Sequence, residues 1–284
     1  MNPRNPRSTK VTTSAAVDIG IDLDYFWAFG FLVLRRFFDP RPLLAEFEQV
    51  MKDGLVSSSD LSHSDGIHFQ YVPMMTAATP VSLSLLDRLA DVAERLLGTS
   101  VLPTRAKAVR YSGDTPWHVD SVVALASIGF AAYLDPLAAG NGALRVLPGS
   151  HRRELGDAIR LLGGAGMHAM ALPSHAVVTE PGHMIVFDEH LFHASSGGGV
   201  RRQWRMDYVS DPVDAGAENN TIEYFARIFP PDWDGGYDID RYPSYGPDWR
   251  ASGRPAVERL EALGVFELAA RQEAFGRTKR KTPE

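Results

Sequence analysis

The chain has 284 residues, 44% of them hydrophobic, which is enough to bury a full core. Its formal charge of -6, with both signs scattered, offers no basic stripe for a phosphate backbone, so we expect no nucleic-acid partner. The absence of cysteine excludes disulfides, thiolate zinc sites and iron–sulfur clusters, and leaves histidine and carboxylate as candidate metal ligands. No apolar run reaches membrane-spanning length and no signal peptide is recognisable, so a cytoplasmic protein is expected.

Residues 19–275 are expected to form one domain, because all-β barrels and sandwiches of this length commonly fold as a single unit. The segments at the two ends, 1–18 and 276–284, are expected to be flexible. The first begins with a polar stretch rich in proline and arginine, and the second carries clustered basic residues.

The early part of the domain is predicted to contain helices that cover a sheet. A short helix should lead into a strand at 31–34, and apolar residues at spacings of three and four predict amphipathic helices at 43–51 and 82–97. Residues 55–80 contain glycine and serine without a sustained period. We therefore expect a lid-like loop there, with one strand at 68–72.

The later part changes to short apolar segments separated by turn-forming residues, a pattern typical of strands. The expected strands are 106–111, 119–125, 129–134, 143–147, 176–179, 184–187 and 203–209. One helix should interrupt them at 152–166, and another should close the chain near 256–273, within an aromatic C-terminal segment, 212–275. Helices followed by a run of strands favour a mainly β fold with flanking helices, either a sandwich or a jelly roll.

A candidate metal pair lies in the stretch from Thr115 to Ser121. His118 and Asp120 stand two positions apart among β-branched and apolar residues. On an extended strand both side chains would project from one face. Two histidines and one carboxylate on one side of a metal suit ferrous iron with open positions, so a second histidine from elsewhere would complete the site.

The setting of His193 distinguishes it from the other histidines that could fill this role. The candidates are His63, His68, His151, His168, His175, His183, His190 and His193. A predicted strand and a short turn precede His193, and a glycine loop and an arginine-bearing strand follow it. A keto acid chelated to iron would leave a distal carboxylate, which a guanidinium can bind in fork geometry.

Alternation along that last strand places Arg201, Gln203, Arg205 and Asp207 on one face and Arg202 on the other. If the first face lines a cavity, Arg205 could contact the substrate. A charged edge that faces solvent is the alternative.

Several of these stretches together resemble the phytanoyl-CoA dioxygenase (PhyH) family of iron(II)/2-oxoglutarate-dependent oxygenases. They are 111–121 with its His-x-Asp, Leu134-Asp135, Asn141-Gly142-Ala143-Leu144, Pro148-Gly149-Ser150-His151 and 182–208. Residues 26–51 are similar to the opening helix and strand of the family, so the resemblance spans most of 19–209. The His-x-Asp stretch and the order of the later motifs are its most specific parts.

The resemblance implies a double-stranded β-helix, the cupin-like jelly roll, that binds iron(II), 2-oxoglutarate and O2. The implied metal ligands are His118, Asp120 and His193. Arg201 would form a salt bridge with the far carboxylate of 2-oxoglutarate, Ser195 would support that carboxylate, and Arg110 matches a position that often contacts the co-substrate.

Three departures from the family pattern stand out. This chain has Gly182-His183 where relatives usually have glycine-aspartate. The loop 195–200 between the distal histidine and the arginine is shorter than in relatives, and Arg201 is preferred over its neighbours because its place on the strand fits the family. The segment 130–133 lacks the tryptophan that relatives often carry there, which would widen the cavity.

The implied activity is oxidation of an unactivated C–H bond in a small metabolite or natural-product intermediate, with release of succinate and CO2. Hydroxylation is the default outcome, and desaturation, cyclisation and epimerisation stay open because the metal ligands do not distinguish them. Asp120 argues against halogenation, because a small residue replaces this carboxylate in related halogenases. A zinc hydrolase using the same His/Asp/His set and a non-catalytic jelly-roll binding protein are the alternatives. The sequence indicates neither the substrate nor the oligomeric state.

Overall fold

The computed structural model describes residues 21–56, 61–62, 68–232 and 236–281. The segment 1–18, expected to be flexible, lies outside these residues, as do parts of the expected lid-like loop. Within that loop the structure has β2 (Leu61–Ser62) and β3 (His68–Pro73), and β3 confirms the strand predicted at 68–72. None of the helices in the described part of the chain combines the length and apolarity needed to cross a membrane.

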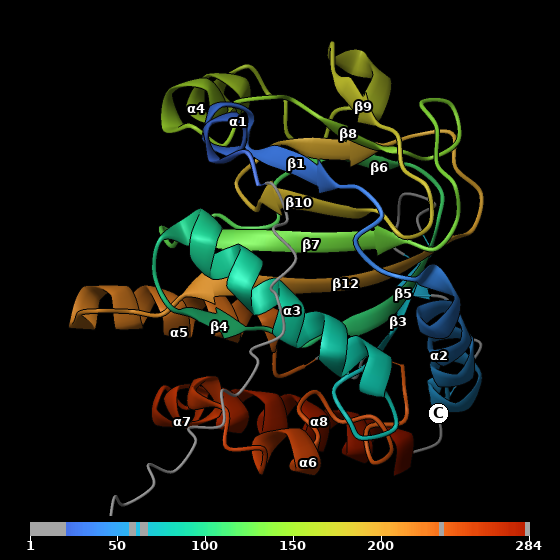
Figure 1. Ribbon diagram of the computed structural model, residues 1–284, viewed down its shortest axis with the longest axis vertical. Coiled ribbons are helices and arrows are strands. Elements are labelled where there is room, and N and C mark those ends of the chain that lie inside the picture. Colours follow the sequence, from blue (N-terminus) through green and yellow to red (C-terminus); the bar gives the residue numbers. More distant parts are fainter. Residues whose placement is uncertain (1–20, 57–60, 63–67, 233–235, 282–284) are drawn as a thin grey trace, which may run out of the picture.

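The described strands form two antiparallel sheets (Figure 1). The larger one has the order β1-β10-β7-β12-β5-β3-β2, with β4 also paired to β12, and the smaller one has the order β6-β11-β8-β9. The other strands of the larger sheet are β1 (Phe31–Leu34), β4 (Val101–Pro103), β5 (Lys107–Ser112), β7 (Ser127–Tyr133), β10 (Met184–Asp188) and β12 (Arg201–Ser210). The smaller sheet consists of β6 (Thr115–His118), β8 (Leu144–Val146), β9 (His175–Val177) and β11 (His193–Ser195). A mainly β fold with flanking helices is thereby confirmed.

Helices flank both sheets. They are α1 (Leu23–Phe29), α2 (Pro40–Gly54), α3 (Pro80–Leu97), α4 (Arg153–Leu161), the 3-10 turn η1 (Ala169–Ala171), α5 (Ala215–Ile228), α6 (Pro247–Arg250), α7 (Pro255–Ala262) and α8 (Val265–Lys281). Figure 1 shows α3 crossing the outer face of the sheet, while α6, α7 and α8 gather at the end opposite α1 and α4. Pro80 opens α3, and Gly98, in the left-handed conformation with φ 68°, ends it.

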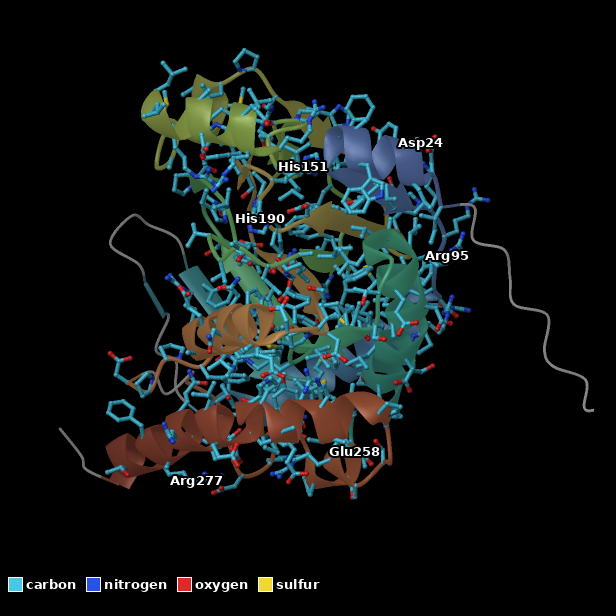
Figure 2. All side chains as sticks on the ribbon, turned by 90° about the vertical axis from the view of Figure 1, so that its left-hand side faces the viewer. Asp24, Arg95, His151, His190, Glu258 and Arg277 are labelled. Carbon is cyan, nitrogen blue, oxygen red and sulfur yellow. The ribbon has the colours of Figure 1, made fainter. Side chains whose placement is uncertain are left out.

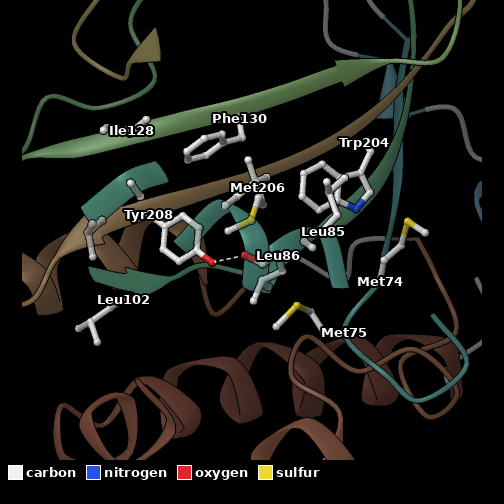
Figure 3. Close-up of a cluster of buried hydrophobic side chains, with 14 of the residues drawn as sticks. Met74, Met75, Leu85, Leu86, Leu102, Ile128, Phe130, Trp204, Met206 and Tyr208 are labelled. Atoms are coloured by element: carbon white, nitrogen blue, oxygen red, sulfur yellow. Dashed lines mark hydrogen bonds between the residues drawn. The ribbon is translucent and has the colours of Figure 1, made fainter. Parts of the chain in front are cut away.

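One face of β12 builds the core beneath α3. Trp204, Met206 and Tyr208 alternate along the strand and pack on the buried leucines of α3, as Figure 3 shows. The Trp204 indole N–H donates to Ser82 Oγ at 2.8 Å, and the Tyr208 hydroxyl donates to the Leu86 carbonyl at 2.8 Å. The opposite face of β12 is thereby turned away from the core.

Replacing Trp204 with alanine should lower the free energy of unfolding by about 3–5 kcal/mol, because it empties a fully buried site and removes the hydrogen bond that the indole donates to Ser82. Urea unfolding followed by circular dichroism measures this change. The control is Val213→Ala, at a side chain that is 87% exposed, which should stay within about 0.5 kcal/mol of the wild type. Similar losses in both variants would contradict the packing described here.

The helices predicted before residue 100 are present, but three later predictions are corrected. Residues 119–125 form a loop rather than a strand, because β6 ends at His118 and the chain there bonds to the end of β10 instead of a ladder. The closing helix at 256–273 is two helices, divided at Gly264 with φ 72°. The expected tail 276–284 begins inside α8, which runs to Lys281.

The sequence reading also missed α5. Asp214 caps it by accepting from the Ala217 N–H at 2.9 Å, and Thr221, Tyr224 and Phe225 form its buried stripe. The sequence contains both signals, an N-cap residue followed by apolar residues at helical spacing.

Candidate active site

The structure brings His118, Asp120 and His193 together. β6 and β11 are antiparallel neighbours, and their register sets His118 directly opposite His193, with ring centroids 4.2 Å apart. Asp120 follows the end of β6, and its Oδ1 lies 3.5 Å from His118 Nε2 and 3.3 Å from His193 Nε2. One donor atom from each residue therefore lies within 4.8 Å of the other two.

Backbone contacts orient all three donors. His118 Nδ1 lies 2.8 Å from the Pro116 carbonyl and His193 Nδ1 lies 2.9 Å from the Leu191 carbonyl, so each Nδ1 carries the hydrogen and each Nε2 lone pair faces the shared space. The Asp120 N–H donates to the Glu189 carbonyl at 2.9 Å, which holds the loop after β6 against the end of β10. Two neutral imidazoles and one carboxylate, so oriented, fit a divalent iron or zinc ion.

Charge around the three residues favours an ionised Asp120. Burial alone would raise the pKa of its carboxyl, but the charges of His193 and Arg205 hold that pKa well below its usual value. Burial lowers the pKa of His193, whereas the carboxylate of Asp120 outweighs burial and raises the pKa of His118.

Arg201 lies at one end of the same cavity and is only 3% exposed. Its guanidinium donates to the carbonyls of Gly142 at 3.2 Å and Gly113 at 2.6 Å, and to Ser195 Oγ at 3.3 Å. No carboxylate of the described residues pairs with it. A buried guanidinium held only by neutral acceptors is poised to bind the carboxylate of a ligand.

Ser195 lies beside this guanidinium, as predicted, and its hydroxyl also donates to Thr115 Oγ1 at 3.2 Å. The loop that precedes Arg201 is fixed by Asp114, which accepts from Ser196 Oγ at 2.9 Å and from the Gly197 N–H at 2.8 Å. The short glycine loop is thus tied to the turn between β5 and β6, and it holds Arg201 in place.

The cavity has a volume of about 620 Å³ and lies between the two sheets. Its wall includes Arg201, Gln203, Arg205 and Asp207, so the predicted polar face of β12 does line a cavity. Arg202 points the other way, where it pairs with Asp135 and, at 2.7 Å, with Glu48.

Arg110 does not join the site. Register places it opposite Arg202 on β12 and Gln70 on β3, on the face turned away from the cavity. Its neighbours Lys107 and Tyr111, one step out of phase, line the cavity instead. The predicted co-substrate contact at Arg110 is therefore wrong, because a shift of one residue moves a strand side chain to the opposite face.

The other described histidines are occupied elsewhere. His190 lies 2.9 Å from Asp188 Oδ1 and 2.8 Å from the Val123 carbonyl, and His151 contacts the Trp27 carbonyl near α1 (Figure 2). His168 pairs with Asp114, His183 accepts from the Glu180 N–H, and His175 stacks on Phe31. The side chains of His63 and His68 lie outside the described residues.

The sequence reading missed a buried charge cluster centred on Arg205. This arginine donates to Asp120 Oδ2 at 2.7 Å, contacts Asp207, and lies 3.5 Å from Glu189 Oε1. The Tyr224 hydroxyl of α5 donates to Glu189 Oε2 at 2.6 Å. Burial and the nearby charge of Asp207 raise the pKa of Glu189 well above its usual value.

Solved structures share this fold. EvdMO1 matches 67% of this chain at 20% identity and a TM-score of 0.52, and the match spans only about half, 49%, of the EvdMO1 chain. EctD from S. alaskensis, solved with 2-oxoglutarate and 5-hydroxyectoine, matches 71% of this chain and 80% of its own at 23% identity and a TM-score of 0.51. SnoN, a non-heme α-ketoglutarate-dependent epimerase from nogalamycin biosynthesis, matches 66% of this chain and 81% of its own at 16% identity and a TM-score of 0.52.

At these identities the likeness shows the fold, and it confirms the predicted jelly roll. No curated protein sequence matches the chain significantly. Residues 26–203, more than half of the chain, match the sequence profile described as phytanoyl-CoA dioxygenase (PhyH). This protein therefore belongs to the phytanoyl-CoA dioxygenase (PhyH) family.

Proposed function

We propose that the protein is an iron(II)- and 2-oxoglutarate-dependent dioxygenase that oxidises a C–H bond of a small molecule. The observation that carries this proposal is the pairing, in one cavity, of three converging metal donors with a buried arginine that has no carboxylate partner among the described residues. EctD has been solved with bound iron and with 2-oxoglutarate, which supports the same pair of ligands here.

In this proposal His118, Asp120 and His193 hold the iron, and Arg201 with Ser195 binds the far carboxylate of 2-oxoglutarate. Bound iron would supply oxidative decarboxylation of 2-oxoglutarate by O2, giving succinate, CO2 and the oxidising power to attack an unactivated C–H bond. The chain itself keeps Asp120 ionised for the metal. It also immobilises Arg201 with three neutral acceptors, so that the guanidinium is in place for the far carboxylate of 2-oxoglutarate.

Hydroxylation is the proposed outcome. SnoN, which shares the fold, is an epimerase, so the fold by itself does not fix the outcome. The wall of the cavity includes Tyr224, Arg227 and Ile228 of α5, within the aromatic C-terminal segment 212–275.

A zinc hydrolase would use the same three donors, but it gives Arg201 no role. A non-catalytic binding protein would not need two histidines with both Nε2 atoms aimed at one carboxylate oxygen. Iron(II) added anaerobically, followed by O2, 2-oxoglutarate and a panel of small molecules, separates the three functions. Succinate above the background of iron alone is expected, and its absence across the panel would overturn the proposal.

Replacing Gly142 with alanine should raise the KM for 2-oxoglutarate by about tenfold. A Cβ there would lie 2.5 Å from Arg201 Nη1, and the backbone has φ +93°, which disfavours any side chain. The guanidinium must therefore move. Gly140→Ala, in the same loop with open space around the new Cβ, is the control and should keep the wild-type KM. Equal values for both variants would show that Arg201 does not hold the co-substrate.

A further inference from the structure

Lys107 is a cavity residue to which the proposed chemistry gives no role. It lies on β5, directly opposite Arg205 on β12 and Pro73 on β3, so its side chain shares the face that lines the cavity. β5 therefore brings an ammonium group to the side of the cavity where Arg205 contacts Asp120.

Each of the other cations of the cavity is either paired with a carboxylate or already assigned to the co-substrate. Arg205 is shared by Asp120, Asp207 and Glu189, and Arg227 pairs with Glu223 at 2.7 Å near the surface. Arg201 lies beside Ser195, at the position proposed for 2-oxoglutarate.

Lys107 has no comparable partner among the described residues. Its ammonium forms no hydrogen bond or ion pair there, and it lies over the Tyr71 ring, with the centroid 5.9 Å away. Burial lowers the pKa of Lys107 to about 8, although the charge of Asp207 partly opposes this, so the group stays mostly protonated at neutral pH. Lys107 is half-buried, and because a partly desolvated cation without an ion-pair partner is costly, a ligand anion would be stabilised here.

Apolar and aromatic side chains line other parts of the same cavity. Phe69 and Tyr111, with ring centroids 5.1 Å apart, lie toward its Arg201 end, because Tyr111 is the register partner of Arg201, and Ile228 and Val122 complete an apolar part of the wall. A single lysine supplies one charge and a compact set of donors, which suits a carboxylate better than a phosphate dianion.

We propose that Lys107 binds a carboxylate of the substrate, which makes the substrate a small organic acid with an apolar or aromatic body. This inference rests on the proposed function, because it takes the space beside Arg205 as the substrate site. It also places the acid group on the Asp120 side of the cavity, away from Arg201, so one enzyme would hold two carboxylates at separate cations.

Three probes with the same phenyl body and chain test the inference: 3-phenylpropionate, 3-phenylpropionamide and 3-phenylpropylamine. Their dissociation constants are measured by anaerobic calorimetry on protein loaded with iron(II) and saturated with 2-oxoglutarate. The carboxylate should bind about tenfold more tightly than the amide, since it alone pairs with an ammonium. The amine should bind most weakly.

Lysine variants locate the effect. Lys107→Met should abolish the advantage of the carboxylate over the amide, and Lys107→Arg should retain most of it. Lys52→Met, at an exposed lysine of α2, is the matched control and should leave the advantage intact. A carboxylate that binds no better than the amide, an amine that binds best, or an advantage that persists in Lys107→Met would each overturn the inference.

The proposed function has a separate readout on the same wild-type sample. Iron(II) chelated by 2-oxoglutarate absorbs visible light by charge transfer, and this band is recorded before any probe is added. A band without carboxylate selectivity would reject the role of Lys107 alone. No band would reject the iron and 2-oxoglutarate site, whatever the probes do.

Discussion

Replacing Asp120 with alanine should abolish succinate formation and weaken iron(II) binding by about 100-fold or more. Loss of residues that only support metal ligands already costs about 10–100-fold, and Asp120 supplies the single carboxylate between the two imidazoles. Its removal also takes away one of the carboxylates that hold Arg205. The dissociation constant for iron(II), measured anaerobically, and the rate of succinate release report the two effects.

Asp157→Ala is the matched control for this substitution. Asp157 pairs with Arg160 on the surface of α4, three positions apart, and takes no part in the cavity. This variant should bind iron(II) as the wild type does. An Asp120→Ala protein that bound iron(II) with unchanged affinity would show that the metal lies elsewhere.

Replacing Arg201 with leucine should raise the KM for 2-oxoglutarate by about 100-fold, because truncating one partner of a buried charge pair costs about 2–5 kcal/mol. Iron(II) binding should change little, since Arg201 does not touch the three donor residues.

Arg202→Leu is the informative comparison, because the sequence alone does not decide which of the neighbouring arginines binds 2-oxoglutarate. Arg202 pairs with Asp135 and Glu48 on the opposite face of β12. This variant should lose stability in urea unfolding while it keeps the wild-type KM. A larger KM effect at Arg202 than at Arg201 would reverse the assignment.

The metal donors were predictable because their spacing and setting are local. The pair His118 and Asp120 shows in the sequence as His-x-Asp, and His193 is distinguished by the strand before it and the arginines after it. The physical reason given for the pair was incomplete, because Asp120 lies past the end of β6. The hydrogen bond from the Asp120 N–H to the Glu189 carbonyl holds the backbone so that the Asp120 carboxylate faces the imidazoles. No pattern in the sequence reveals this hydrogen bond.

Arg110 shows where prediction failed and why. Its strand was predicted correctly, but which face of β5 meets the cavity depends on pairing with β12, whose residues follow about ninety positions later. Alternation gives two faces and does not say which is inside. The same pairing brings Lys107 into the cavity, so the error at Arg110 and the omission of Lys107 have one cause.

The cluster around Arg205 was unpredictable for a different reason. Glu189 and Tyr224 come from the end of β10 and from α5, and only the folded chain buries them together, with the Tyr224 hydroxyl donating to a carboxyl whose pKa burial raises. The alternation that placed Arg205 on the polar face of β12 was correct, whereas its partners depend on tertiary structure.

The most direct test of the iron and 2-oxoglutarate site is an anaerobic titration of 2-oxoglutarate into iron(II)-loaded protein, followed by visible absorption. The account predicts a charge-transfer band that saturates at one equivalent per chain, is absent in Asp120→Ala and His193→Ala, and needs far more 2-oxoglutarate in Arg201→Leu. A wild-type protein without the band, or a band unchanged in Asp120→Ala and His193→Ala, would contradict it.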